Sequence, residues 1–356
     1  MTTNLERNIF SQGDSLAAVL LHQRGQGAPA LREAASLLRS GKPILITGIG
    51  ASFFASLPLE YALSAAVKDA RAIEAGELLH YRSNAVRDSV AVLVSRSGES
   101  VEIARLLEAL KGRTTIIGVS NEPQSQLARH ADISIHVGSL ADEIVAIQTY
   151  TGTLLTLYLL AGHITDTVEA NEATAEKLLP AFATAVESHM GRLHEWDDFL
   201  NVGSPIYLLA RGPSCASAHE GALLLHEVAK SPAVAMAAAS FRHGPVEVVD
   251  RQFRGLIFTP HGRTQKLNLS LAADLTRFGG QVRVIGPPHP EFETSSPFCE
   301  LPVVPESLAP LFEIVPVQAA ALRMAELHGI RPGSFRYAPQ VTVDEANFSG
   351  RCSDEK

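Results

Sequence analysis

The stretch Pro43-Ile-Leu-Ile-Thr-Gly-Ile-Gly50 decides the fold. Its short apolar run lies between a proline and a glycine-rich turn, which is typical of a strand buried on both faces. A helical pattern, Ser52–Lys68, follows directly. A buried strand that passes through a glycine turn into a helix opens a βα unit, so the sequence predicts a parallel sheet covered by helices.

The pattern continues along the first half of the chain. Further strands are expected at 89–94, 114–119 and 133–137, with helices at 101–111 and 143–160. Helical stretches flank this unit at 5–39 and 165–200. Strands that alternate with helices favour an α/β fold with a parallel sheet between helical layers, a three-layer, flavodoxin-like arrangement.

The same pattern then restarts in the second half. Four segments repeat in order: Ile206–Gly212 after Ile44–Gly50, 255–264 after the turn at 95–100, Val282–Gly286 after Thr115–Gly118, and Glu313–Gln318 after Glu143–Gln148. Repeats in one order at a slowly growing offset predict a duplicated α/β domain. We expect a helical segment at 1–35, a first domain at 36–165, a helical linker at 166–200, a second domain at 201–335 and a tail at 336–356.

Composition narrows the function. Of 356 residues, 46% are hydrophobic, and 30 basic residues face 38 acidic ones, for a net charge of -8. Such a chain buries sizeable cores and is a poor partner for nucleic acids or anionic membranes. We find no apolar run of membrane-spanning length and no secretory signal. Cys215, Cys299 and Cys352 form no CxxC motif and are typical of free thiols, so we expect a soluble cytoplasmic protein.

The turn Ser95-Arg-Ser-Gly-Glu-Ser100 comes after a predicted strand and before a predicted helix. Ligands of open α/β sheets bind beyond the carboxyl ends of the strands. Gly98 lets the backbone approach a ligand, and the serine hydroxyls with the first helical N–H groups suit a phosphate, to which Arg96 adds charge. Ser97 and Ser100 are equally ordinary capping residues, so these residues alone leave a purely structural role open.

The second half offers carboxylates and histidines. Glu220 and Glu227 lie seven residues apart on one predicted helix, and His243 precedes Gly-Pro and is therefore expected on a loop. Glu227 and His243 would suit a general base and acid, although a solvated glutamate and a turn histidine fit the pattern too. No metal-binding motif is present, and we expect no metal and no cofactor.

Together these motifs resemble the double-domain form of the sugar isomerase (SIS) family. Its members include the isomerase half of glutamine–fructose-6-phosphate aminotransferase, amino-sugar-phosphate deaminases and fructosamine-phosphate deglycases. The resemblance covers about residues 30–345. It rests on six segments: Gly50-Ala-Ser52, Ser95-Arg-Ser-Gly-Glu-Ser100, Glu143-Ile144 at the start of the expected long helix, Glu220-Gly-Ala-Leu through Glu227, Arg242-His-Gly-Pro245 and Val341-Thr-Val343.

The resemblance implies roles for individual residues. The sugar phosphate would be held by Gly50, Ser52, Ser95, Arg96, Ser97, Gly98 and Ser100. Glu227 would move a proton between C1 and C2 of the open-chain sugar, and His243 would assist ring opening. In relatives this histidine comes from the neighbouring subunit, so a homodimer is implied.

Two departures from the family pattern limit the reaction. The family aminotransferase has lysines where this chain has Leu224 and Pro339, and no glutaminase domain precedes the first unit of this sequence. Glutamine-dependent amino-sugar synthesis is therefore not expected, whereas isomerisation, deamination and deglycation remain open. The alternatives are a non-catalytic phosphosugar sensor or regulator, and a structural paralogue without activity.

Overall fold

The computed structural model describes residues 3–66, 69–86, 88–289, 298–337 and 341–346; Pro339 and Cys352 lie outside these ranges. The chain forms two compact units, and each unit combines one long segment with a terminal segment from the other half of the sequence. The first α/β unit comprises Ser11–Leu179 and Ser334–Lys356, and the second comprises Met1–Phe10 and Pro180–Gly333.

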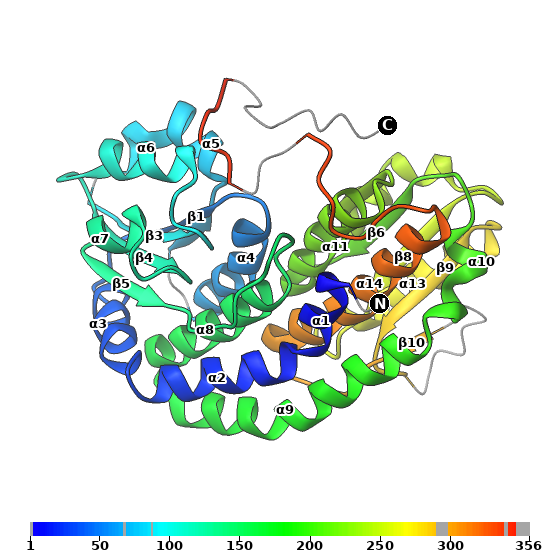
Figure 1. The fold of residues 1–356 in the computed structure, drawn as a ribbon, viewed down its shortest axis with the longest axis horizontal. Helices are drawn as coiled ribbons and strands as arrows, with labels where there is room; N and C mark the ends of the chain where they lie inside the picture. Colours follow the sequence, from blue (N-terminus) through cyan, green and yellow to red (C-terminus); the bar gives the residue numbers. More distant parts are fainter. Residues whose placement is uncertain (1–2, 67–68, 87, 290–297, 338–340, 347–356) are drawn as a thin grey trace. The chain divides into compact units, whose positions relative to one another are not determined.

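The first α/β unit is built on a parallel sheet of strand order β2-β1-β3-β4-β5. Helices α3, α4 and α8 lie on one face of this sheet, with α2 packed on α8, while α5, α6 and α7 lie on the other face (Figure 1). The apolar strands β1 and β3 are buried throughout, as the sequence predicts. The strands are β1 (Ile44–Gly48), β2 (Ala70–Ala72), β3 (Val90–Val94), β4 (Thr115–Ser120) and β5 (Ile133–His136); the helices are α2 (Gln12–Arg24), α3 (Ala28–Leu38), α4 (Ala51–Ala65), α5 (Ala75–Glu77), η1 (Leu78–Arg82), η2 (Ser83–Ala85), α6 (Val101–Leu110), α7 (Gln126–His130) and α8 (Gln148–Thr165).

The second α/β unit repeats this architecture with strand order β7-β6-β8-β9-β10. Helices α11 and α14 lie on one face and α12 and α13 on the other, and α1 packs against α14. The strands are β6 (Ile206–Ala210), β7 (Ala233–Ala237), β8 (Arg254–Phe258), β9 (Gln281–Gly286) and β10 (Phe298–Glu300); the helices are α1 (Asn4–Phe10), η3 (Leu193–Trp196), α10 (Asp197–Leu200), η4 (Gly212–Ser214), α11 (Cys215–Ala229), α12 (Ala238–Phe241), η5 (Pro245–Val248), α13 (Gln265–Arg277), η6 (Glu306–Leu308) and α14 (Ala309–Leu327), with α9 (Val168–Gly191) joining the units.

The strand order confirms the duplication. Ile44 pairs with Val90 in the first sheet as Ile206 pairs with Arg254 in the second. The neighbouring strands correct one repeat, because Thr115 pairs with Val90 while Gln281 pairs with Arg254, so that Gly286 corresponds to Ser120 and not to Gly118. Side chains alternate along a strand with a period of two, and therefore a shift of two residues leaves the apolar pattern unchanged.

Two features of the elements differ from the sequence prediction. The edge strands β2, β7 and β10 were not expected, because they are short or rich in alanine and carry little β signal. The helix expected at 143–160 begins at Gln148, because the Asp142 carboxylate accepts hydrogen bonds from the Ile147, Gln148 and Thr149 N–H groups at 2.9–3.0 Å. A carboxylate that satisfies these donors fixes the start of the helix.

One segment of the described chain is long and apolar enough to cross a membrane. It runs from Glu306 to Leu327, and 94% of its most apolar window is buried inside the protein. Such burial is typical of the core helix of a globular domain.

Candidate functional site

The first sheet has a topological switch point between β1 and β3. These strands are neighbours, but the chain leaves β1 towards β2 and leaves β3 towards β4. A crevice at such a point, beyond the carboxyl ends of the strands, is the usual ligand site of an open α/β sheet. The structure brings seven predicted residues to the two turns that flank it: Gly50 and Ser52 after β1, and Ser95, Arg96, Ser97, Gly98 and Ser100 after β3.

The turn after β1 depends on glycine. Gly50 has φ 52° and ψ −134°, a backbone conformation that side chains disfavour. The Ser52 side chain then reaches the neighbouring turn, where its Oγ accepts a hydrogen bond from the Arg96 N–H at 3.1 Å. This bond joins the two turns directly.

The three serines of the second turn have different environments. Ser95 is buried, and its Oγ accepts a hydrogen bond from the Gly98 N–H at 3.0 Å. Ser97 Oγ accepts from the Glu99 N–H at 3.3 Å. Ser100 is the N-cap residue of α6, but its side chain makes no capping hydrogen bond. Ser95 therefore shapes the turn, whereas the Ser100 hydroxyl is not used by its own helix.

Gly98 lets the turn pack closely on its neighbour. Its φ is +65°, and a Cβ built on it would lie 2.2 Å from Ser125 Oγ. Any side chain at Gly98 would therefore both strain the backbone and displace Ser125, the residue that caps α7 through the Ala128 N–H.

The electrostatics of this crevice favour an anion. The N-termini of α4 and α6 both follow the flanking turns, and helix N-termini present free N–H groups and a partial positive charge. The Arg96 guanidinium extends towards the segment before α8, where Nη1 donates to the Ile144 carbonyl oxygen at 2.9 Å. This bond connects the turn Ser95–Ser100, the serine turn, to the segment in which the Asp142 carboxylate fixes the start of α8.

Sequence reasoning missed other residues around the serine turn. Asn121 donates its N–H to the Arg96 carbonyl oxygen at 3.1 Å, and its side chain bonds the Ser139 backbone. The Val101 N–H, at the start of α6, donates to the Thr342 carbonyl oxygen at 3.0 Å. The Glu345 carboxylate binds His80 and Arg105. Only Asn121 carried a local signal, its place directly after a predicted strand.

The other two predicted residues belong to the second α/β unit. Glu227 lies in the last turn of α11 and is partly exposed, while His243 is exposed on the turn between α12 and η5. Leu224 is 1% exposed, so this position contributes only to the core.

Burial changes the titration of two groups near α11. Desolvation lowers the pKa of His219, which favours the neutral imidazole. Desolvation raises the pKa of Glu313 on α14 to about 7, although hydrogen bonds from Ser217 and Ser214 oppose the rise. No group of three His, Cys, Asp or Glu side chains suited to a metal occurs among the residues that the structure describes.

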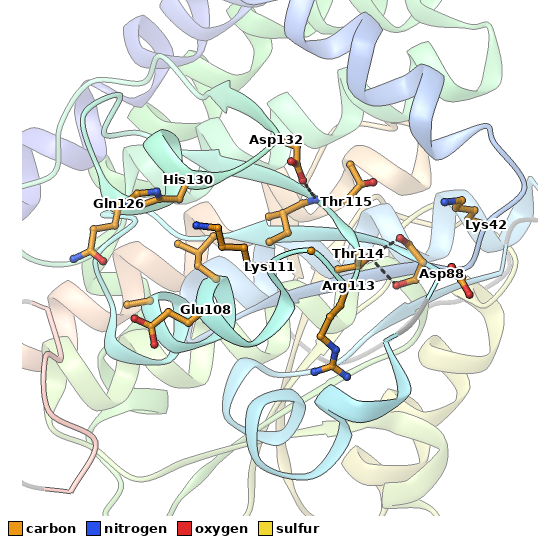
Figure 2. Close-up of a pocket in the computed structure, with 15 residues that line it drawn as sticks. Lys42, Asp88, Glu108, Lys111, Arg113, Thr114, Thr115, Gln126, His130 and Asp132 are labelled. Carbon is orange, nitrogen blue, oxygen red and sulfur yellow. Dashed lines mark hydrogen bonds between the residues drawn. The ribbon is translucent and has the colours of Figure 1, made fainter.

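The first unit has a separate hollow of about 680 Å³. Figure 2 shows residues that line it. It lies at the amino ends of the strands, where Lys42, Ser89 and Thr115 precede or begin β1, β3 and β4. None of the predicted site residues lines it. It is thus distinct from the crevice at the carboxyl ends.

Comparison with known proteins places the chain in a family. The sequence profile of the SIS domain matches residues 37–163 and 200–326. The glutamine–fructose-6-phosphate aminotransferase of Pyrococcus horikoshii is 29% identical over 318 residues, which cover 87% of this chain and 53% of that protein. The Pyrobaculum aerophilum enzyme of the same name is 27% identical over 346 residues, covering 95% and 57%. The chain spans about half the length of these curated relatives.

Solved structures share the fold. The C-terminal domain of glucosamine-fructose-6-phosphate aminotransferase from Francisella tularensis superposes with TM-score 0.86 at 20% identity, covering 94% of this chain and 98% of that one. Tagatose-6-phosphate ketose/aldose isomerase from Escherichia coli superposes with a TM-score of 0.77 at 19% identity, and the match covers 93% of this chain and 94% of that one. Glucosamine-6-phosphate deaminase from Thermotoga maritima superposes with a TM-score of 0.75 at 19% identity, and the match covers 96% of this chain and 99% of that one. With two matched domains and this duplicated architecture, the chain belongs to the SIS domain family.

Proposed function

We propose that the chain is an enzyme of the phosphosugar isomerase type that binds the phosphate of a sugar at the switch point of its first α/β unit. The observation that carries the proposal is the hydrogen bond between the Arg96 N–H and Ser52 Oγ, which holds together two turns that each lead into a helix N-terminus. A phosphate there would accept from those backbone N–H groups that the turns do not use themselves, and from the Ser97 and Ser100 hydroxyls. Gly50 and Gly98 keep the backbone accessible, and Arg96 positions the turn.

Glu227 is proposed as the residue that moves the proton. A carboxylate can take a proton from one carbon of an open-chain sugar and return it to the adjacent carbon, which interconverts aldose and ketose without a cofactor. The buried Leu224 provides no amine for a Schiff base at its position. Proton transfer between C1 and C2 is therefore the step that we propose. It passes through an enediol in isomerisation and through an enolamine in deamination, where water then hydrolyses the resulting imine and ammonia leaves.

His243 is proposed as the ring-opening acid and base, contributed across a homodimer interface. Its exposure on a turn supports this role. So does β7, a partly exposed edge strand of sequence Ala-Val-Ala-Met-Ala that leads to this turn. An apolar strand edge without charged side chains is prone to pair with another chain.

Binding tests the proposal most simply. We would titrate the purified protein calorimetrically with fructose 6-phosphate, glucose 6-phosphate and glucosamine 6-phosphate, and with the unphosphorylated sugars. We expect at least one of the phosphorylated sugars to bind, and its affinity to fall in the S97A/S100A double variant. Equal affinity with and without the phosphate group would remove the switch point from the proposal.

A non-catalytic sensor is the second candidate function. It would bind the same sugar phosphate, so binding does not separate the two candidates, but it would not exchange the C1 or C2 protons with solvent. The chain's acidic net charge of -8 disfavours a sensor that itself binds DNA.

A further inference from the structure

The second α/β unit contains a copy of the switch point between β6 and β8. Because Ile206 corresponds to Ile44 and Arg254 to Val90, Gly212 corresponds to Gly50 and Gly262 to Gly98. At the first of these positions the φ angle is similar, 59° at Gly212 and 52° at Gly50, whereas Gly262 does not share the positive φ of Gly98. Helices α11 and α13 follow the two turns, as α4 and α6 do in the first unit.

A carboxyl group of the chain itself fills this copy. A Cβ built on Gly262 would lie 2.4 Å from Glu306 Cδ, and a Cβ built on Gly212 would lie 3.8 Å from Glu306 Oε1. The Glu306 carboxyl group therefore lies against the turn at Gly262 and near the turn at Gly212. The Cβ position of Gly98 in the first unit instead meets Ser125 and Leu127, which carry no charge.

A second carboxyl group engages the serine that corresponds to Ser52. Ser214 Oγ donates to Glu313 Oε1 at 2.8 Å, and Ser217 Oγ donates to Glu313 Oε2 at 2.6 Å. In the first unit the equivalent hydroxyl accepts from a backbone N–H instead. The corresponding turn of the second unit therefore also has a serine, but this serine donates its hydroxyl hydrogen to the buried Glu313 carboxyl group.

The surroundings of Glu306 suit an anion. Two helix N-termini follow these two turns, and carboxylates are stabilised there. The turns also contribute Arg211 and Arg263. The Thr264 hydroxyl, at the N-cap of α13, is buried and has no hydrogen-bond partner among the residues that the structure describes. An anion with more acceptor oxygens than a carboxylate would supply that hydroxyl with a partner.

We propose that the second unit holds a latent phosphate site, at the turns that correspond to those of the first unit, which the Glu306 carboxylate occupies as an internal anion. Glu306 excludes phosphate because both carry negative charge and both need the same turns. The protein therefore takes one phosphate per chain, at the first unit, a count that rests on the proposed function.

The test is calorimetric titration with inorganic phosphate, at low salt and a pH near 6. At this pH most Glu313 side chains are neutral, because burial raises the pKa of this group to about 7. We expect the wild type to bind one phosphate per chain and E306A to bind two. E306Q, which removes the charge and keeps the shape, is expected to show the second site at lower affinity. E300A removes an equally acidic, exposed side chain on β10 and is expected to leave the count at one.

The S97A/S100A background assigns each site. In that background E306A is expected to retain only the second-unit site. One phosphate per chain in both wild type and E306A, with E306Q unchanged, would overturn the latent site and leave the proposed function standing. If wild type bound no phosphate but E306A bound one, the result would contradict the phosphate site of the proposed function and support the latent site. Unfolding curves of each variant would establish that a missing site does not reflect a misfolded second unit.

Discussion

The hydroxyl of Ser95 accepts a hydrogen bond from the Gly98 N–H, while that of Ser100 takes no part in capping α6. One hydroxyl of this turn therefore stabilises the turn itself, while the other is not used by its own helix. The sequence alone does not separate these roles, because both serines follow the same predicted strand and precede the same predicted helix. The division depends on which backbone N–H each hydroxyl meets in the folded turn.

Removing the Ser100 hydroxyl is expected to affect binding and not stability. A hydrogen bond to a charged phosphate is worth about 1.5–3 kcal/mol, so S100A is expected to weaken sugar-phosphate binding by roughly tenfold or more. Its unfolding free energy is expected to stay within about 0.5 kcal/mol of wild type. Calorimetry and urea unfolding would measure the two quantities.

Ser95→Ala is the matched control. It leaves the Gly98 N–H without its acceptor in a buried turn, so we expect a loss of about 1–3 kcal/mol in unfolding free energy. A Ser95→Ala protein as stable as wild type would contradict the structural role given to Ser95.

Glu313 makes the stability of the second unit depend on pH. Its pKa is raised from 4.5 to about 7 by burial, so the folded state holds the proton more tightly than the unfolded chain does. The resulting stabilisation is fully present below pH 4.5 and is lost as pH rises through about 7. At about 1.36 kcal/mol per pKa unit, the change amounts to roughly 3 kcal/mol.

Glu313→Gln is expected to remove this dependence, because its amide does not titrate. Urea unfolding of wild type and variant between pH 5 and pH 8 would measure it. Parallel stability profiles for the two proteins would show that Glu313 does not hold its proton in the folded state.

At the scale of elements, the long buried strands were predictable and the edges were not. β1 and β3 are continuous apolar runs bounded by turn residues, and the structure confirms both. β2 has three residues and β7 is rich in alanine, so neither carries a local strand signal. The start of α8 depends on Asp142, a contact that periodicity does not reveal.

The segment 341–346 shows the same limit for the site. From the sequence, this segment showed only a resemblance to the family's C-terminal Val-Thr-Val. In the structure, the Thr342 carbonyl oxygen accepts a hydrogen bond from the Val101 N–H at the start of α6, and Glu345 forms an ion pair with Arg105 of that helix. Such contacts depend on residues more than 200 positions apart, as the separation of 240 between Arg105 and Glu345 shows. No local pattern encodes them.

Breaking the Glu345 ion pairs is expected to release this segment from α6 without unfolding the unit. Exposed ion pairs contribute little to global stability. Glu345→Gln should therefore leave the melting temperature unchanged and accelerate hydrogen exchange at the Val101 amide, which then loses the Thr342 carbonyl. Hydrogen-exchange mass spectrometry or NMR would detect this, with Glu108→Gln on the exposed side of α6 as the control. Equal protection in both variants would show that Glu345 does not hold the segment.

At the scale of the whole molecule, duplication was the most predictable property. The two units share strand order and pairing, so repeats separated by more than 160 residues reported a real correspondence. The serine turn was predictable because it follows the carboxyl end of a central strand, where α/β folds place ligands. The position of the Glu306 carboxyl group beside the corresponding turn of the second unit was not predictable, because Glu306 comes from a different part of the chain.

The central claim is that this SIS protein moves a proton between adjacent carbons of a phosphorylated sugar. Proton NMR in D2O tests it most directly, with fructose 6-phosphate, glucose 6-phosphate and glucosamine 6-phosphate as separate substrates and released ammonia assayed in parallel. We expect deuterium to enter at C1 or C2 with wild type, and the exchange rate to fall at least about a hundredfold in Glu227→Gln, in line with the usual contribution of a general base. Exchange at the wild-type rate in Glu227→Gln would contradict the assignment of the base, and no exchange with any sugar phosphate that the protein binds would contradict catalysis itself.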